Sequence, residues 1–152
     1  MIMKYEMRVD LSTIVDIPPK DHRIMRYETL RPIELAFIRR VYRDAWPNGQ
    51  RARWSLLEWD NFIKGSYTFM NSAGFVEYHL EPGDTAFVEL LAVDHSYQRQ
   101  GHGTALMQHV IRRAKLDDLR RVALVTTPEV VPFYTRMGFD IYRELPDEPV
   151  AA

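Results

Sequence analysis

One continuous stretch, residues 84–115, constrains the fold of this chain more than any other part of it. It opens with an apolar run, Ala86 to Val93, which is bounded by turn-forming residues and predicts a buried strand. It ends in a predicted helix, because Leu106, Val110 and Ala114 recur at helical spacing on one face. A glycine-containing loop, QRQGHGT, joins the strand to the helix.

This loop predicts an anion site. The first backbone N–H groups of a helix have no acceptor within the helix and lie at the positive end of its dipole. Gly101 and Gly103 have no Cβ atom, so they can adopt positive φ and let a phosphate approach, and Thr104 adds a hydroxyl. A diphosphate fits this chemistry, although such glycines also occur in plain turns and helix caps. The dinucleotide-binding fingerprint would require a third glycine where Leu106 stands.

The spacing Gln98-x-x-Gly101-x-Gly103 resembles the Q/R-x-x-G-x-G/A signature of the GCN5-related N-acetyltransferases (GNAT), whose loop holds the pyrophosphate of acetyl-CoA. The strand sequence ELLAVD before the loop resembles the fourth strand of that family, and PFYTRMGF resembles its C-terminal motif. The resemblance covers residues 22–142 and is most specific in the second half. It implies an acetyl-CoA-dependent enzyme that transfers an acetyl group to a primary amine by direct attack in a ternary complex.

The other local signals predict an α/β fold with a mixed, mostly antiparallel sheet that contains one parallel strand pair. The resemblance implies that this central pair is splayed and that helices cover both faces. One helix has Pro32 in its first turn, and another begins at the capping-box pattern from Ser55 to Glu58. A helical crossover makes the strand at 122–126 parallel to the strand before the loop. An ordinary strand-helix-strand unit without a ligand is the alternative. Strands are expected at Lys4–Leu11, Arg23–Tyr27, Ser66–Met70, Gly74–Leu80, Thr85–Val93, Val122–Thr126 and Asp140–Leu145.

Length and composition favour one domain, at residues 22–152, preceded by an N-terminal extension at residues 1–21 that holds a strand and a proline-containing linker. Twenty basic and 21 acidic side chains leave no net field to attract nucleic acid or an anionic membrane. The absence of cysteine excludes disulfides, thiolate metal sites and a cysteine nucleophile. His95, His102 and His109 are not spaced as metal ligands, so no metal is expected. Without a signal peptide or long apolar span, the expected compartment is the cytoplasm.

Acetyl transfer from a thioester to an amine needs a neutral nucleophile, a polarised carbonyl and a protonated leaving thiolate. The resemblance gives Tyr134, within PFYTRMGF, the role of donating to the sulfur. A phenol with a pKa of about 10 suits a thiolate of similar basicity. A tyrosine that only packs beside Phe133 is the alternative.

Glu89, on the strand before the loop, stands where several relatives carry a glutamate that deprotonates the amine through water. A surface or salt-bridged glutamate is the alternative. The next candidates for the base are Glu77, Tyr78 and His79 on the neighbouring strand. The resemblance also implies an oxyanion donor, a backbone N–H near Leu91 or Ala92 on a bulged strand.

The resemblance assigns cofactor binding to the end of this strand, the glycine loop and the C-terminal motif. Thr127 stands where relatives often carry an asparagine that bonds the cofactor. The predicted acetyl-CoA contacts are Leu91, Ala92, Val93, Arg99, Gln100, Gly101, His102, Gly103, Thr104, Thr127 and Phe133.

The C-terminal end departs from the family pattern. Only one strand candidate follows Phe139, whereas a typical relative has a final hairpin there. The missing strand would leave a sheet edge open, and the strand at 4–11 is a spare one. We expect this strand at an edge, either beside the strand at 23–27 or in a partner subunit, and we favour a homodimer.

The acceptor amine is the least constrained feature. By resemblance, one wall of its site is the segment from Trp46 to Trp54, with Arg51 and Arg53. This segment predicts an open groove for a peptide or protein amine, a small acidic amine held by the arginines, or merely solvated arginines. Two further classes stay open: a non-catalytic acyl-CoA-binding module, and an interaction domain in which the three tryptophans form an exposed aromatic patch.

Overall fold

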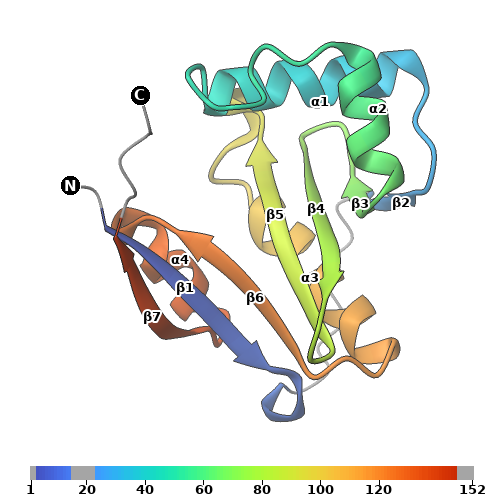
Figure 1. Cartoon of the computed structure of the whole chain (residues 1–152). Helices are drawn as coiled ribbons and strands as arrows, with labels where there is room; N and C mark the ends of the chain where they lie inside the picture. The colour runs from blue at the N-terminus through green and yellow to red at the C-terminus, as the bar shows by residue number, and fades with distance from the viewer. Residues whose placement is uncertain (1–2, 15–22, 147–152) are drawn as a thin grey trace.

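The computed structural model describes residues 3–14 and 23–146 of the chain. All seven predicted strands are present, with ends within two residues of those expected, and the predicted fold class is confirmed. Most of the predicted linker and the C-terminal tail, at 15–22 and 147–152, lie outside the described residues. In chain order the elements are β1 (Met3–Asp10), β2 (Met25–Tyr27), α1 (Pro32–Ala45), α2 (Leu56–Lys64), β3 (Tyr67–Met70), β4 (Gly74–Glu81), β5 (Thr85–Val93), α3 (His102–Leu116), β6 (Arg121–Thr126), α4 (Val131–Thr135) and β7 (Asp140–Pro146) (Figure 1).

The strands form one sheet in the order β2-β3-β4-β5-β6-β1-β7. Within the described residues, β5 and β6 form its only parallel pair. Helices α1 and α2 cover one face over β3, β4 and β5, while α3 and α4 lie behind the sheet in Figure 1. The sheet therefore has helices on both faces, as the resemblance implied.

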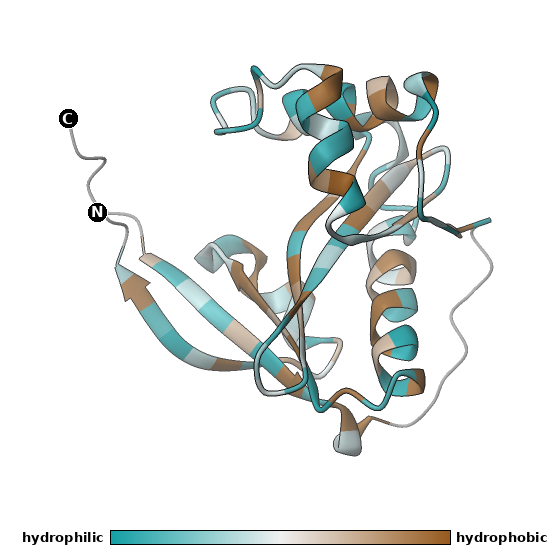
Figure 2. Ribbon diagram, turned by 45° about the vertical axis from the view of Figure 1, so that its right-hand side comes forward, coloured by the Kyte–Doolittle hydropathy of each residue, from teal (hydrophilic) through white to brown (hydrophobic). Residues whose placement is uncertain are grey.

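Each helix packs through an apolar stripe. Along α3, apolar bands alternate with polar bands (Figure 2), and its Leu106 and Val110 are fully buried in one core with Val88 of β5. On the other face, Ile38 of α1 and Trp59 of α2 are buried in a second core. The two cores follow from strand alternation, because successive side chains of a strand point to opposite faces.

The start of α2 confirms the predicted capping box. The Glu58 N–H donates to the Ser55 hydroxyl at 3.2 Å, and the Ser55 N–H donates to the Glu58 carboxylate at 3.2 Å. These bonds satisfy donors that a helix start leaves without a partner. They fix the point at which the chain leaves the α1–α2 connection.

The pairing of β4 with β5 is irregular at Glu89. Tyr78 pairs with Val88, and Glu77 pairs with Leu90, so Glu89 is the extra residue of a bulge. The bulge also changes the alternation, since Val88 faces the α3 core whereas Leu90 faces the α1–α2 core. The resemblance implied a bulged strand here.

Beyond the bulge, β5 and β6 separate. Their parallel pairing runs only from Thr85 with Arg121 to Val88 with Leu124. In Figure 1 the two strands diverge from that point on. Residues 89–93 of β5 therefore have β4 on one side and no strand partner on the other.

The predicted position of the first strand is wrong. Strand β1 lies inside the sheet, antiparallel to β6 through Met7 with Leu124 and to β7 through Met3 with Pro146. Its Met7 and Val9 are 0% and 2% exposed, because the strand has a neighbour on each side and the α3 core on one face. It thus supplies the antiparallel partner of β7 that a final hairpin would have provided.

This placement also removes the reason given for a homodimer. The open edge that a partner subunit was expected to cover is filled by β1 of the same chain. The remaining edge strands of the sheet are β2, which has three residues, and β7. The homodimer is left as a prediction without that support.

Candidate active site

A pocket of about 820 Å³ lies where β5, the glycine loop, the start of α3 and α4 meet. It brings together most of the predicted cofactor residues, but Ala92, Gln100 and Thr127 are not in its wall. Its lining is Leu91, Val93, Tyr97, Gln98, Arg99, Gly101, His102, Gly103, Thr104, Glu129, Val130, Phe133 and Arg136. Among the lining residues missed from the sequence, Arg136 lies within the PFYTRMGF motif, which was the available signal.

The two loop glycines serve different purposes. Gly101 is the N-cap of α3 with φ 82°, a conformation that favours glycine. Gly103 lies within the first turn of α3 and is not among the glycines with positive φ, so the expectation of positive φ there is wrong. A Cβ at Gly103 would lie 3.4 Å from the Phe133 ring and 3.8 Å from Val93, so this glycine leaves space in the pocket.

The helix start supplies anion-binding groups. The first hydrogen bond of α3 runs from the Ala105 N–H to the Gly101 carbonyl at 3.0 Å. The N–H groups of Gly103 and Thr104 precede it and therefore have no acceptor inside the helix. Arg99 and Arg136 add two positive side chains to the wall. This end of the pocket has the chemistry of a phosphate site.

The backbone of β5 presents further groups to the separated strands. The Asp94 N–H donates to the Ala73 carbonyl at 2.7 Å, which makes these residues a hydrogen-bonded pair. Because such pairs alternate along antiparallel strands, Ala92 bonds to β4, while the backbone groups of Leu91 and Val93 point away from β4. They face the side from which β6 has departed. Of the two residues expected to lie near an oxyanion donor, Leu91 has the favourable orientation.

Tyr134 lies in α4 beside this pocket rather than in its wall. Its side chain is 7% exposed and meets the rings of Phe133 and Phe139 at centroid distances of 5.0 and 5.7 Å. Burial raises the pKa of Tyr134 to about 12, so the phenol is protonated at neutral pH and can donate a hydrogen bond. The packing role and the donor role are compatible in this position.

The Thr127 side chain does not line the pocket, although it was predicted to contact the cofactor. Thr127 precedes the short turn Pro128–Val130 and does not cap it. Together with the backbone N–H of Glu129, the Thr127 hydroxyl lowers the pKa of the Glu129 carboxyl. Thr127 therefore reaches the pocket through Glu129.

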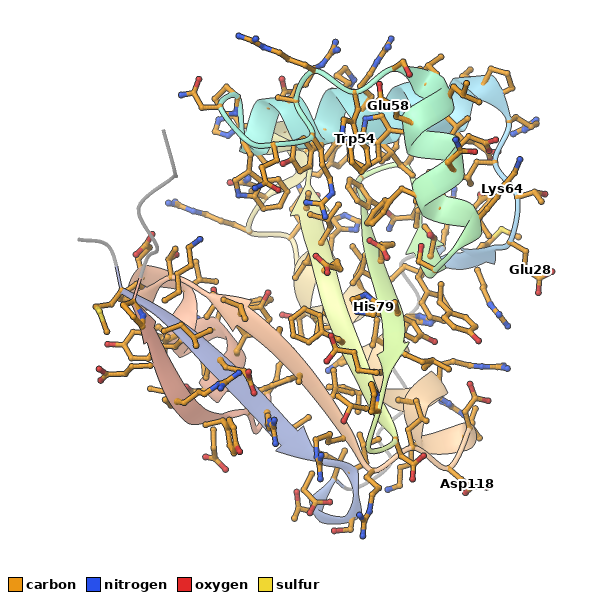
Figure 3. All side chains as sticks on the ribbon, viewed as in Figure 1. Glu28, Trp54, Glu58, Lys64, His79 and Asp118 are labelled. Carbon is orange, nitrogen blue, oxygen red and sulfur yellow. The ribbon has the colours of Figure 1, made fainter. Side chains whose placement is uncertain are left out.

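On the α1–α2 face, three predicted candidates for the base lie together. Glu89 is 3.5 Å from the Arg51 guanidinium and 3.8 Å from Nδ1 of His79. Its side chain is 31% exposed, so it is a salt-bridged residue that solvent can still reach. Figure 3 shows His79 on β4 and Trp54 above it, near α1 and α2. Tyr78, the other candidate, is buried in the α3 core on the opposite face.

Glu77 is the most unusual member of this group. It is 0% exposed, and neither of its carboxyl oxygens has a hydrogen-bond partner among the described residues. Burial raises the pKa of Glu77 to about 8; the Ser66 hydroxyl and Arg51 oppose the shift, and Glu89 adds to it. Glu77 is therefore largely protonated at neutral pH.

The predicted acceptor wall is ordered by aromatic contacts. The Arg51 guanidinium lies 5.3 Å from the Trp54 ring and 4.9 Å from the Phe62 ring, so the solvated alternative does not hold for this arginine. Arg53 is exposed. The interaction-domain alternative loses its patch, because Trp59 is fully buried and Trp54 packs on it at 5.0 Å.

In the part of the chain that the structure describes, no cluster of three or more histidine or acidic side chains is arranged to hold a metal ion. None of the described helices is long and apolar enough to cross a membrane. The site thus has a loop-and-helix pocket on one face of the sheet and a group of carboxylates on the other, on either side of the place where β5 and β6 separate. This combination defines the class of site expected of a protein whose ligand carries a phosphate group.

Comparison with protein families agrees with that class. The model of the acetyltransferase (GNAT) family matches residues 35–139, which is more than half of the chain. The chain therefore belongs to this family of acetyltransferases.

Solved structures share the fold. A GCN5-related N-acetyltransferase from Sphaerobacter thermophilus matches 94% of this chain and 49% of its own, with a TM-score of 0.69 and 14% identity. This chain thus spans about half the length of that protein. An acetyltransferase of the GNAT family from Streptococcus pneumoniae matches 78% of this chain and 86% of its own, with a TM-score of 0.57 and 27% identity. An aminoglycoside 6'-N-acetyltransferase complexed with coenzyme A matches 76% and 83%, with a TM-score of 0.62 and 13% identity.

Proposed function

We propose that this chain is an acetyl-CoA-dependent N-acetyltransferase that acts on a primary amine by direct attack in a ternary complex. The observation that carries the proposal is the separation of β5 from β6, which lies between the glycine-loop pocket and the carboxylate group on the opposite face. A donor held on one side can thereby meet an acceptor held on the other. Acetyl-CoA supplies the activated acyl group.

The pocket fits such a donor. Its volume of about 820 Å³ lies within the range of cofactor pockets. The N–H groups of Gly103 and Thr104 are placed to hold the diphosphate, and Arg99 and Arg136 offset its charge. Gly103 leaves the space that the donor needs beside Phe133.

Three groups of this chain would then take part in the reaction, two as hydrogen-bond donors and one as the base. The Leu91 N–H is oriented to donate to the acetyl carbonyl oxygen as it gains charge. The protonated Tyr134 phenol can donate to the departing sulfur. Glu89, which solvent can reach, would accept the amine proton through water.

One observation favours a second candidate. The Arg51 guanidinium is 3.5 Å from Glu89, so the carboxylate that would act as the base already has a cationic partner. A non-catalytic acyl-CoA-binding module would keep the pocket and tolerate this pair.

Acetyl-CoA turnover with a panel of primary amines separates the two candidates. Release of free CoA that depends on an amine supports the enzyme. In an active enzyme, Glu89→Gln should flatten the acidic limb of the kcat/KM profile. Calorimetric binding of acetyl-CoA with no turnover of any amine would support the binding module instead.

A further inference from the structure

A second pocket, of about 680 Å³, lies on the α2 side of the sheet, away from the glycine loop. The end of α2, with Asn61 and Phe62, forms one wall, and Glu77 and His79 of β4 form another. Its remaining lining includes the turn at 65–66. Because His79 lies 3.8 Å from Glu89, this pocket adjoins the carboxylate that faces the proposed reaction centre.

The wall of this pocket carries unused hydrogen-bonding capacity. The Glu77 side chain is fully buried, and both of its oxygens are without a partner among the described residues. Its cross-strand neighbour Thr68 is also fully buried, and its hydroxyl likewise has no partner there. The nearby Ser66 hydroxyl donates to the carbonyls of Phe62 and Ile63 at 3.2 Å, and it lies close enough to the Glu77 carboxyl to lower its pKa.

Buried polar groups without partners are rare, since each costs free energy unless a donor reaches it. A carboxyl group accepts hydrogen bonds, and a cation is its strongest partner. Around the pocket, the carboxyl groups of Glu77, Glu81 and Glu89 outnumber the guanidinium of Arg51. A positively charged nitrogen therefore fits the pocket better than a carboxylate would.

The same surroundings disfavour an acidic acceptor. Arg51, the arginine expected to hold one, is 3.5 Å from Glu89 and packed against Trp54 and Phe62. A ligand carboxylate beside Arg51 would also lie next to the Glu89 carboxylate, which would repel it. A ligand ammonium in the pocket leaves the pair intact.

We propose that the pocket between α2 and β4 binds a second ammonium group of the acceptor, with Glu77 as its counter-ion, so that the acceptor is a small diamine or polyamine. This inference rests on the proposed acetyltransferase function. One amine of such a substrate lies beside Glu89 for acetylation, and the other lies in the pocket.

The protonation of Glu77 provides an independent readout. Burial raises its pKa to about 8, so the carboxyl is mostly neutral at pH 7 in the free protein. Arg51 opposes the shift and Glu89 adds to it, so both must stay unchanged in the variants that are compared. An ammonium group favours the charged carboxylate, so binding should release a proton.

The test is calorimetry with 1,5-diaminopentane and, as a matched monoamine, pentylamine, in the absence of acetyl-CoA. We expect the diamine to bind about tenfold or more tightly than the monoamine. Its binding enthalpy should vary with the ionisation enthalpy of the buffer, which reports the released proton. Glu77→Gln should abolish both differences, whereas Asp140→Asn, at the exposed start of β7 on the opposite edge of the sheet, should retain them.

A second variant does not depend on tolerance of a change at a buried site. Asn61 is exposed at the pocket wall, and Asn61→Lys would place an ammonium group there. It should weaken diamine binding and leave pentylamine binding unchanged. Equal affinity for the two amines, or an unchanged diamine advantage in both variants, would overturn the inference.

The outcome that would refute the proposed function differs from the one that would refute the ammonium-binding pocket. Acetyl-CoA turnover with pentylamine and no diamine advantage would refute the pocket and retain the acetyltransferase. Diamine binding with proton release, but no turnover of any amine, would retain the pocket and refute the enzyme.

Discussion

At the scale of single residues, the site depends on groups whose position, rather than type, determines their chemistry. Gly101 supplies a backbone conformation and Gly103 supplies space, although both stand in one motif. Likewise, Glu77 and Glu89 lie on adjacent strands of one face, but the first is buried and largely neutral, and the second is paired with Arg51.

We predict that Gly101→Ala raises the KM for acetyl-CoA by about tenfold, because a side chain at φ 82° strains the N-cap and displaces the first N–H groups of α3. Gly83→Ala is the matched control. Gly83 has the same φ of 82°, but it lies in the β4–β5 turn, away from the pocket. Steady-state kinetics at saturating amine measure both. An equal rise in KM for the two variants would contradict a specific role of the loop.

For Tyr134→Phe we expect kcat to fall about tenfold or more, with little change in acetyl-CoA affinity, since the lost hydrogen bond strengthens only as charge forms on sulfur. Tyr78→Phe removes another buried phenol, whose pKa is also raised to about 12 by burial but which lies in the α3 core. Its kcat should stay at the wild-type value. A Tyr134→Phe enzyme with full kcat would assign Tyr134 to packing alone.

Glu77 should also make stability depend on pH. Its pKa of about 8 lies above the ordinary value of 4.5, so the folded protein binds this proton more tightly than the unfolded chain does. The free energy of unfolding should therefore fall as pH rises between these values, by up to about 1.4 kcal/mol per pH unit from this group. Glu77→Gln removes this slope. Urea unfolding at pH 5, 6, 7 and 8 measures it, and parallel curves for wild type and variant would contradict the assignment.

At the scale of elements, the strands and the loop were predictable because their signals are local. The glycine loop, the PFYTRMGF motif and the Ser55–Glu58 capping box can each be recognised within a few residues. The position of β1 in the sheet could not be predicted, because the sequence of a strand does not show which strand it pairs with more than one hundred residues away. The same holds for the Arg51–Glu89 pair and the lack of a partner at Glu77, which arise only when separate elements meet.

The interior position of β1 predicts a large cost for truncating its core residue. Met7 is 0% exposed in the α3 core, so Met7→Ala should lower the free energy of unfolding by about 2–5 kcal/mol. Met25→Ala is a chemically identical change on the edge strand β2, where the residue is 62% exposed. It should cost less than about 0.5 kcal/mol. Similar urea midpoints for the two variants would show that β1 is not a core strand.

At the scale of the whole molecule, the sheet consists of two parts joined along a short parallel ladder. One part, β2 to β5, carries α1, α2 and α3, and the other is β6, β1 and β7 with α4 behind it (Figure 1). The glycine-loop pocket and the carboxylate group lie on opposite faces of the sheet, near the place where these two parts separate. Phe133 and Arg136, which line the pocket, lie with the part that β1 completes, so β1 supports the site as well as the fold.

The register of β1 with β7 leads to the last prediction. Met3 pairs with Pro146, so the start of β1 lies beside the end of β7. A circular permutant that begins at residue 23 and joins residue 152 directly to residue 1 would make β7 and β1 a C-terminal hairpin, with residues 147–152 and 1–2 as its loop. Because no described contact is broken, we expect this permutant to fold, to bind acetyl-CoA as the natural order does and to show a similar midpoint in urea.

The control is the chain 23–152 without β1, which exposes the unpaired strands β6 and β7 and should aggregate or stay unfolded. Circular dichroism, urea unfolding and acetyl-CoA calorimetry compare the three chains. If the shortened chain were as stable as the full one, β1 would be dispensable. If the permutant failed to fold while the natural order folded, the strand would need to precede the rest of the sheet along the chain, and its register with β7 would not suffice to place it.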